Sequence, residues 1–321
     1  MKIAFASCSN IIMQKDNQPI WGIIHGQKPD LLLLLGDNVY MGDIPFDADI
    51  LEEKYKQQLA EPHFNKLICD IPYLAVWDNH DFGSNTNDLF NNTLTSAQKK
   101  QSRDLFDRYL KNRSIRPHTE HVYCSYDYNR NGTNVRVIML DVRSSQEKPG
   151  VNATLLGEKQ EAWLLEKMTT SPGITIICSG IAYSFDPDMN WKLYKNWSGR
   201  FIKALSLTSK PLFLGGNNHT NRFAYHELED PIISFPIRKK FFYEAISSSV
   251  GRNHQNDDED VYNLYDTYIG CPQNKYGIVN IIPNEVEIIL YSQWPERFYH
   301  RVIDVNTWKL KKENHWISHQ V

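Results

Sequence analysis

The feature that most limits the fold of this chain is a series of short apolar segments, each of which ends abruptly in a polar cluster. Apolar runs of this length are typical of strands that are buried on both faces of a sheet. The segments with this pattern are residues 2–7, 30–35, 73–77, 135–140, 173–178 and 211–214. We therefore expect a sheet core built from these segments.

The stretches between these strands carry the apolar spacing of amphipathic helices. We predict helices at about residues 47–60, 95–112, 155–170 and 190–206. Residues 123–128 and 135–140 flank Asn131-Gly132, a pair that supplies the positive φ angles of a tight hairpin turn. Further strands are expected at residues 275–282, 285–292 and 298–305. The whole pattern predicts an α/β protein, a four-layer α/β/β/α sandwich with mixed β-sheets.

Composition excludes several classes of protein. The chain has 321 residues, 41% of them hydrophobic, and no linker or repeat that would divide it, so one domain over residues 1–321 is expected. A net charge of −3 gives no strong case for a nucleic-acid or membrane partner. The longest apolar run, residues 31–35, is far shorter than the roughly 20 residues of a membrane span. A soluble protein is predicted.

The cysteines and the N-terminus bear on the cellular compartment. Five cysteines are present, widely spaced and without a C-x-x-C pair, which argues against a disulfide framework or a structural zinc cluster. Residues 1–8 are too short for a signal peptide and fit a first strand better. These features predict a cytoplasmic location, while an exported form stays open.

The polar residues that end these strands are candidates for a shared site. In α/β sheets ligands bind outside the carboxyl ends of the strands, so residues far apart in sequence converge there. Each candidate also has a purely structural alternative: a capping Asp with a packed Tyr, a capping Asn with a core His, a glycine turn with a surface Asn, or an inert buried thiol. The candidates are Cys8, Asp37 with Tyr40, Asn79 with His80, and Asn217 with His219. Their common position favours a site that binds metal.

Several ordered motifs resemble a known family, the PhoD-like alkaline phosphatases and phosphodiesterases of the calcineurin-like metallophosphoesterase superfamily. Residues 5–9 resemble its first-strand segment, 35–40 its G-D-x-x-Y block, 77–83 its W-D-[DN]-H-[DE] block, 140–143 its L-D-x-R strand, and 156–164 its L-G-x-x-Q-x-x-W-L helix. Residues 179–181 and 216–219 complete the series. The resemblance covers about residues 3–220 and implies the metallophosphoesterase type of sandwich.

The resemblance also implies two metal ions. The first, expected to be Fe³⁺, would be held by Cys8, Asp37, Tyr40 and His219, because thiolate and phenolate suit iron. The second, expected to be Ca²⁺ with Mn²⁺ or Zn²⁺ as alternatives, would share Asp37 and take oxygens from Asn79 and Asn217. Two such ions about 3.5–4 Å apart activate a hydroxide for attack on a small phosphoester substrate.

His80 and Arg143 are the expected catalytic residues. The resemblance assigns His80 to the leaving alkoxide and Arg143 to the phosphate oxygens, with a surface salt bridge as the alternative for Arg143. Other polar residues near the third motif, Asp78, Asp81, Asn85 and Asp88, are expected to be solvated loop residues.

One departure from the family pattern leaves a second function open. The family has an aspartate after the glycine of its last motif, where this chain has Asn217. The lost charge should weaken the second metal site. The alternative is therefore a catalytically weakened or inactive phosphoesterase fold that binds a phosphate ligand or a partner. A hydrolase with a covalent nucleophile is disfavoured, because no G-x-S-x-G motif is present.

Two features of the last third are ambiguous in sequence. The acidic segment 251–260 is either a solvated loop or a substrate lid or calcium-attracting rim. The tyrosines at 262, 265, 268 and 276 either line a pocket for an organic leaving group or pack on a sheet.

Overall fold

The computed structural model describes most of the chain. It covers residues 1–11, 19–42, 44–83, 94–110, 121–130, 132–171, 173–228, 240–250, 262–263, 266–269, 274–292 and 297–318, with backbone alone at 262–263, 266–269, 297–298 and 312–318. Asn85, Asp88, Tyr265 and the acidic segment 251–260 lie outside the described residues, as do the side chains of Tyr262 and Tyr268. Tyr276 is buried, and its ring stacks on that of Tyr291, as sheet packing requires.

The first sheet has seven strands in the order β15-β14-β13-β12-β1-β2-β3. Its N-terminal strands run parallel, and β12 to β15 form an antiparallel meander that joins at β1. The strands are β1 (Lys2–Ala6), β2 (Leu31–Leu35), β3 (Tyr73–Val76), β12 (Lys275–Ile282), β13 (Glu285–Ser292), β14 (Arg297–Asp304) and β15 (Lys309–Ser318). All five leucines of β2 are buried, as a central parallel strand requires.

The second sheet has eight strands in the order β10-β11-β8-β9-β7-β6-β5-β4. The strands β5, β6, β7 and β9 run parallel, while β4 and β8 are antiparallel to their neighbours. The strands are β4 (Cys124–Arg130), β5 (Thr133–Met139), β6 (Ile174–Ser179), β7 (Pro211–Gly215), β8 (Asn221–Leu228), β9 (Lys240–Ser247), β10 (Tyr262–Asn263) and β11 (Asp266–Ile269). The hairpin predicted from Asn131-Gly132 is β4 and β5.

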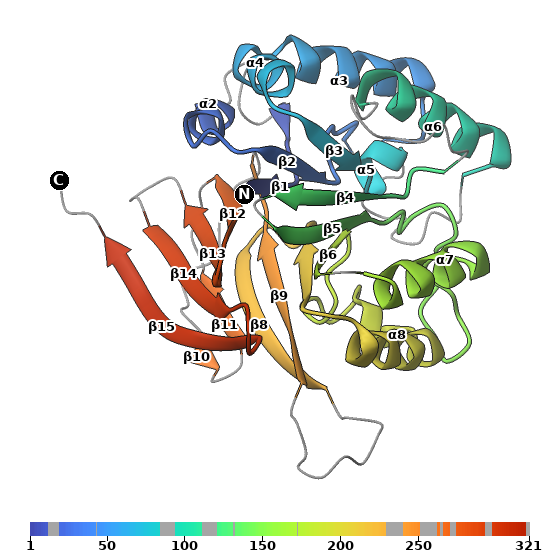
Figure 1. Cartoon of the computed structure of the whole chain (residues 1–321). Coiled ribbons are helices and arrows are strands. Elements are labelled where there is room, and N and C mark those ends of the chain that lie inside the picture. The colour runs from blue at the N-terminus through green and yellow to red at the C-terminus, as the bar shows by residue number, and fades with distance from the viewer. Residues whose placement is uncertain are drawn as a thin grey trace.

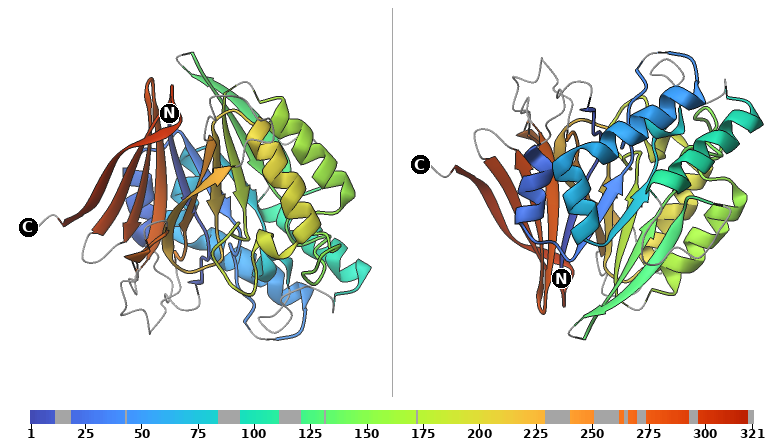
Figure 2. Two further views of the ribbon diagram at one scale, coloured as in Figure 1. Left: turned by 90° about the horizontal axis from the view of Figure 1, so that it is seen from below. Right: turned by 90° about the horizontal axis from the view of Figure 1, so that it is seen from above.

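Helices cover the outer faces of both sheets, which confirms the four-layer prediction. Figure 1 shows α2, α3, α4 and α6 over the first sheet and α7 and α8 over the second. Figure 2 shows the two sheets face to face between these helical layers. The helices are α2 (Pro19–Gly26), α3 (Ala48–Ala60), α4 (Pro62–Asp70), α5 (Asn79–Phe82), α6 (Ser96–Leu110), α7 (Glu158–Thr169), the 3₁₀ turn η1 (Trp191–Leu193) and α8 (Lys195–Leu207).

The core has two main parts. One joins the two sheets and the helices on the first, and the other lies between the second sheet and the pair α7 and α8.

Among the described helices, none is long and apolar enough to cross a lipid bilayer. Each layer thus buries one face of a sheet, and the parallel strands of both sheets end in loops that carry the candidate site residues.

The four predicted helices and the predicted strands are present, while some elements were not foreseen. The helix α4 begins two residues after α3 ends, and Glu61 between them accepts a hydrogen bond from the Phe64 amide at 2.6 Å, so it caps α4. The edge strand β15 is rich in lysine and lacks an apolar run, because an edge strand needs fewer buried residues.

Candidate metal centre

Three predicted metal ligands meet where strands of both sheets end. Cys8 follows β1, Asp37 follows β2, and His219 follows β7. Within the described part of the chain, one ligand atom from each lies within 4.8 Å of the other two, and all three residues are buried. The convergence expected from the strand ends therefore brings a sulfur, an oxygen and a nitrogen donor together.

The backbone at these positions is in the left-handed region that non-glycine residues rarely adopt. The φ angles of Cys8, Asp37, Asn217 and His219 are 60°, 52°, 61° and 53°. Such conformations cost about 1–3 kcal/mol each and persist where the surrounding structure fixes them. Two backbone hydrogen bonds, Cys8 N to Gly36 O at 3.1 Å and Ser9 N to Asp37 O at 2.8 Å, tie the first two turns together.

Asp37 is the centre of this cluster. Its Oδ1 accepts a hydrogen bond from the His80 amide at 3.1 Å, and its Oδ2 accepts from the Tyr40 hydroxyl at 3.3 Å and from the Cys8 thiol at 3.6 Å. Burial raises the pKa of Asp37, against these hydrogen bonds and the Arg143 charge. A cation beside the carboxylate would reverse that shift.

The thiol of Cys8 is fully buried and receives a hydrogen bond from the Ser248 hydroxyl at 3.0 Å. Burial, and then the neighbouring negative charge of Asp37, raise the pKa of this thiol far above its ordinary value. Without a cation the thiol is therefore protonated, whereas a bound metal ion deprotonates a coordinating thiol outright. The donor set of thiol, carboxylate and imidazole fits a transition metal such as iron.

His80 and Tyr40 lie beside this cluster. Their rings are tilted with centroids 4.0 Å apart, and both residues are buried. His80 stands on the one-turn helix α5, which Asp78 caps at its N-terminus and Gly83 ends with a φ of 84°. The local sequence thus fixes the imidazole next to Asp37.

Asp78 and Asp81 are not solvated loop residues, and that expectation was wrong. Both are fully buried, because they form the reciprocal capping box of α5. Asp81 also accepts hydrogen bonds from the amide and the side chain of Asn38 at 2.9 and 3.0 Å. Burial raises the pKa of Asp81 well above its usual range and that of Asp78 to about 6. Together they lock the second and third strand-end turns onto each other.

Arg143 is buried as well, so its salt bridge is not at the surface. Its Nε donates to Asp78 Oδ1, one terminal nitrogen donates to Gln146 Oε1 at 2.9 Å, and the other lies 3.5 Å from Asn79 Oδ1. The guanidinium thus contacts the amide oxygen of a predicted ligand. Contact of Arg143 with phosphate stays a prediction.

The two predicted asparagine ligands differ in their surroundings. Asn79 is buried, while Asn217 is half-buried and its side chain makes no hydrogen bond with any residue that the structure describes. Asn217 lies two residues before His219, in the same loop after β7. Their roles as ligands of a second metal ion stay predictions.

Sequence reasoning missed two residues that support this site. Ser248 follows β9 of the second sheet, and Lys275 begins β12 of the first sheet. Ser248 accepts the His219 amide at 3.2 Å and also donates to Cys8, so it joins two of the three donors. The buried Lys275 ammonium donates to the His219 carbonyl at 3.0 Å. The available signal was the segment 241–246, which is apolar except for Glu244 and is followed by three serines, a pattern that marks another strand end.

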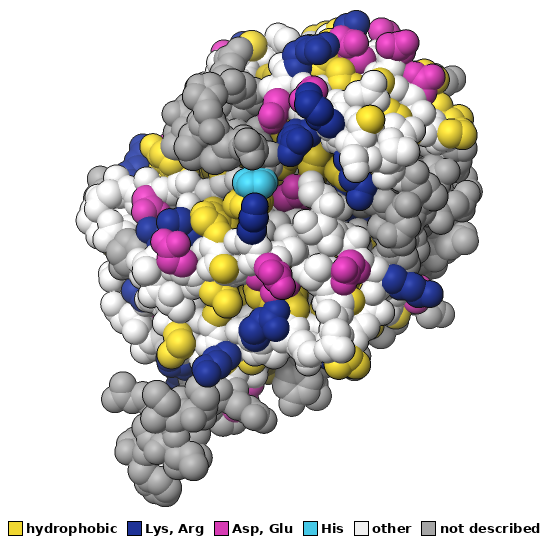
Figure 3. All heavy atoms as spheres, turned by 90° about the vertical axis from the view of Figure 1, so that its right-hand side faces the viewer, with side chains coloured by type: hydrophobic (Ala, Val, Ile, Leu, Met, Phe, Trp, Pro, Cys, Tyr) yellow, Lys and Arg dark blue, Asp and Glu magenta, His cyan; other side chains and the backbone are white. Residues whose placement is uncertain are grey.

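Charges on one outer face of the molecule give no extended basic area. Figure 3 shows Lys and Arg side chains interspersed with Asp and Glu over the part of this face that is drawn in colour. This agrees with the near balance of 35 basic and 38 acidic residues.

Comparison with known proteins agrees with this geometry. None of the curated proteins matches the chain in sequence. A solved structure described as "Structure of PhoD" has a TM-score of 0.73 at 15% identity, and the match covers 98% of this chain and 72% of that one. This likeness shows the fold alone. The family of PhoD-like phosphatases matches residues 3–174, more than half of the chain, and the protein belongs to that family.

Proposed function

We propose that this protein is a metal-dependent phosphoric ester hydrolase, a phosphodiesterase or phosphomonoesterase, that acts on a small phosphoester. The observation that carries the proposal is the buried cluster of Cys8, Asp37 and His219 at the strand ends of a PhoD-like chain. The buried carboxylate of Asp37 is costly without a cation, because burial disfavours its charged form. The cluster is therefore best explained as a metal site.

In this proposal Cys8, Asp37, Tyr40 and His219 hold the first metal, Fe³⁺, and Asp37, Asn79 and Asn217 hold the second, Ca²⁺. The bound ions would supply positive charge to the phosphate oxygens and lower the pKa of water. Support for the sulfur and phenol ligands comes from the hydrogen bonds of Cys8 and Tyr40 to Asp37 Oδ2. Both donors already face the same carboxylate oxygen.

His80 is proposed to assist the leaving alkoxide. Its backbone amide orients Asp37 and its ring packs on Tyr40, so the imidazole is fixed before any substrate binds. Preorganisation of this kind lowers the barrier only if the ring stays in place, which the capping of α5 by Asp78 ensures.

The proposal is tested by assaying para-nitrophenyl phosphate and bis-para-nitrophenyl phosphate with added iron, calcium, manganese or zinc. Asp37→Asn should lower kcat/KM at least about a hundredfold, because charge stabilisation by metal is worth several kcal/mol. Asp49→Asn, on the exposed face of α3, is the matched control and should keep the wild-type rate. No turnover by folded wild-type protein under any metal condition would refute the proposal.

A second candidate is a phosphate-ligand or partner-binding protein with a weakened site. It is favoured by Asn217, whose neutral side chain makes no hydrogen bond with the described residues. Its signature is one bound metal per chain and no turnover. If wild-type protein turns over substrate and Asn217→Asp leaves that rate unchanged, this candidate is excluded.

A further inference from the structure

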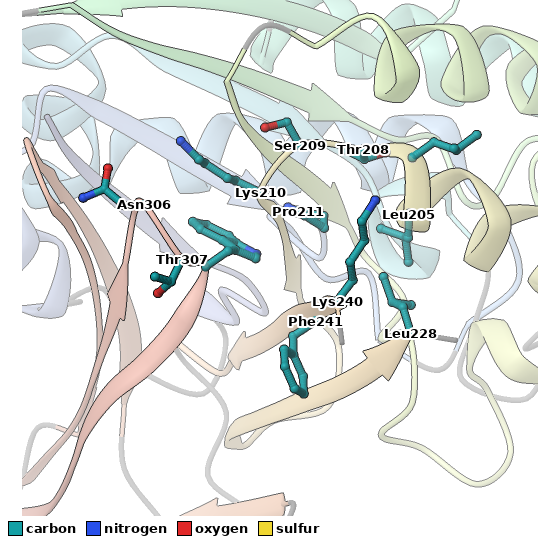
Figure 4. Close-up of a pocket in the computed structure, with 12 residues that line it drawn as sticks. Leu205, Thr208, Ser209, Lys210, Pro211, Leu228, Lys240, Phe241, Asn306 and Thr307 are labelled. Atoms are coloured by element: carbon teal, nitrogen blue, oxygen red, sulfur yellow. The ribbon is translucent and has the colours of Figure 1, made fainter. Parts of the chain in front are cut away.

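A cavity of about 420 Å³ lies at the edge of the sandwich away from the metal centre. Its lining comes from the end of α8, the start of β7, the facing ends of β8 and β9 and the turn between β14 and β15 (Figure 4). Pro211 at the start of β7 lines it, whereas Asn217 and His219 follow the end of that strand. A strand of this length spans roughly 16 Å, so the two sites are separate.

The lining combines cations, hydroxyls and apolar surface. Lys210 and Lys240 supply positive charge, and no carboxylate is among the lining residues. Of the other lining residues, four carry a hydroxyl or an amide and six are apolar, among them Leu205, Leu228 and Phe241. Ligand sites combine apolar surface with polar groups that fix orientation, and this cavity offers apolar and polar surface in similar amounts.

The two lysines differ in what they already bind. Lys240 donates to the Ser206 carbonyl at the end of α8, which leaves two of its three N–H groups for other acceptors. The Lys210 ammonium makes no hydrogen bond or ion pair with any residue that the structure describes. An anion in the cavity would therefore find a cation whose charge the described protein leaves uncompensated.

Backbone conformation sets this cavity apart. Seven described non-glycine residues have positive φ; four belong to the candidate metal centre, and Lys210 and Trp308, at 49° and 52°, both line the cavity. Glycine fits such positions more readily than a lysine or a tryptophan does. Strained residues of this kind cluster at functional sites.

Trp308 adds a second observation. The residue is 9% exposed, and its buried indole N–H donates no hydrogen bond to the described residues. Its backbone is held firmly, since Trp308 N donates to Asp304 O at 2.8 Å and the Tyr243 hydroxyl donates to Trp308 O at 3.0 Å. A buried donor without an acceptor is unfavourable, and because this nitrogen has almost no accessible surface, a ligand acceptor would reach it only if the lining shifts.

We propose that this cavity is a binding site for a small organic anion with an apolar or aromatic body. The anionic head lies at Lys210 and Lys240, and the body packs on Leu205, Leu228 and Phe241. The site is distinct from the metal centre and does not depend on the proposed hydrolysis.

The probe for the test is 8-anilinonaphthalene-1-sulfonate, an aromatic anion whose fluorescence rises in apolar surroundings. The purified full chain should bind one molecule saturably. Lys210→Glu should raise its Kd at least about tenfold, because a charge-assisted hydrogen bond is worth about 1.5–3 kcal/mol. Ser209→Trp, which places a large ring at an exposed lining position, should raise it as much. Lys203→Glu, on the exposed face of α8 outside the lining, should change it less than about twofold.

The uncharged N-phenyl-1-naphthylamine separates charge from apolar contact, and it should bind at least about tenfold more weakly than the sulfonate. Circular dichroism establishes that each variant is folded. Each of three results would overturn the proposal. The first is binding that Lys210→Glu and Ser209→Trp both leave unchanged, and the second is equal binding of the uncharged probe. The third is no saturable binding by folded wild-type protein. Ser209→Trp keeps the test decisive if Lys210→Glu does not fold.

Discussion

Asp78 and Arg143, 65 residues apart in sequence, form an ion pair with no exposed side-chain surface in either partner. The pair joins the turn after β3 to the loop after β5, one from each sheet. Arg143 also reaches Asn79 Oδ1 and Gln146, so its charge is divided among several acceptors. Two oppositely charged groups thus connect the sheets directly behind the candidate metal centre.

Arg143→Met should destabilise the protein by about 3–5 kcal/mol, because it leaves the Asp78 carboxylate buried without its partner. Urea unfolding of both proteins measures this difference in the free energy of unfolding. The matched control is Arg108→Met, which removes a surface pair with Glu52 and should have little or no measurable effect. Equal small effects of both substitutions would show that Arg143 is not needed to compensate Asp78.

Ser248→Ala should weaken the binding of the first metal by about 10–100-fold, because the hydroxyl orients both Cys8 and the His219 turn. Competition with a chelator, read by metal analysis and by the visible charge-transfer band expected of an iron thiolate, measures the affinity. Ser247→Ala is the matched control, since this neighbouring buried serine donates to Asn221 Oδ1 instead. A loss of affinity shared equally by both variants would point to general destabilisation.

Gly277→Ala should destabilise the first sheet by about 1–3 kcal/mol, because a Cβ there would lie 2.1 Å from the Phe5 ring on the paired strand. Thermal unfolding measures the effect, and adding Phe5→Leu should restore part of the loss. Gly26→Ala, where nothing lies within 4 Å of the new Cβ, is the control and should be neutral. Wild-type stability of Gly277→Ala would contradict the close packing of β1 on β12.

The β14–β15 turn should lose stability in acid through Asp304. Hydrogen bonds from the Thr307 amide, with Lys311 next to it, lower the pKa of Asp304 to about 2. A lowered pKa means that the ionised group stabilises the fold at pH values above its unfolded pKa of 3.8, and this contribution is lost as the pH falls through about 2. The stability difference between wild-type and Asp304→Asn should therefore shrink between about pH 4 and pH 2.

Chemical unfolding at several pH values measures this difference, and Asp49→Asn is the control, because Asp49 is exposed on α3 and its side chain caps nothing. A difference between wild-type and Asp304→Asn that stays constant across the range would contradict the assignment.

The sequence alone determined much of the fold and the positions of the site residues. Buried parallel strands and amphipathic helices are local patterns of apolar residues, so segments such as β2 and α7 could be predicted with nearly the observed bounds. Cys8, Asp37 and His219 could be grouped because the carboxyl ends of parallel strands meet at one edge.

Tertiary structure decided the rest, because it depends on contacts between residues far apart in the chain. Nothing near Asp78 in sequence reveals that Arg143 will bury it, and Ser248 meets Cys8 across 240 positions. The cavity with Lys210 and Trp308 arises where separate elements of the two sheets meet. Local patterns set which residues end each strand, whereas burial and charge pairing follow only from how the two sheets pack together.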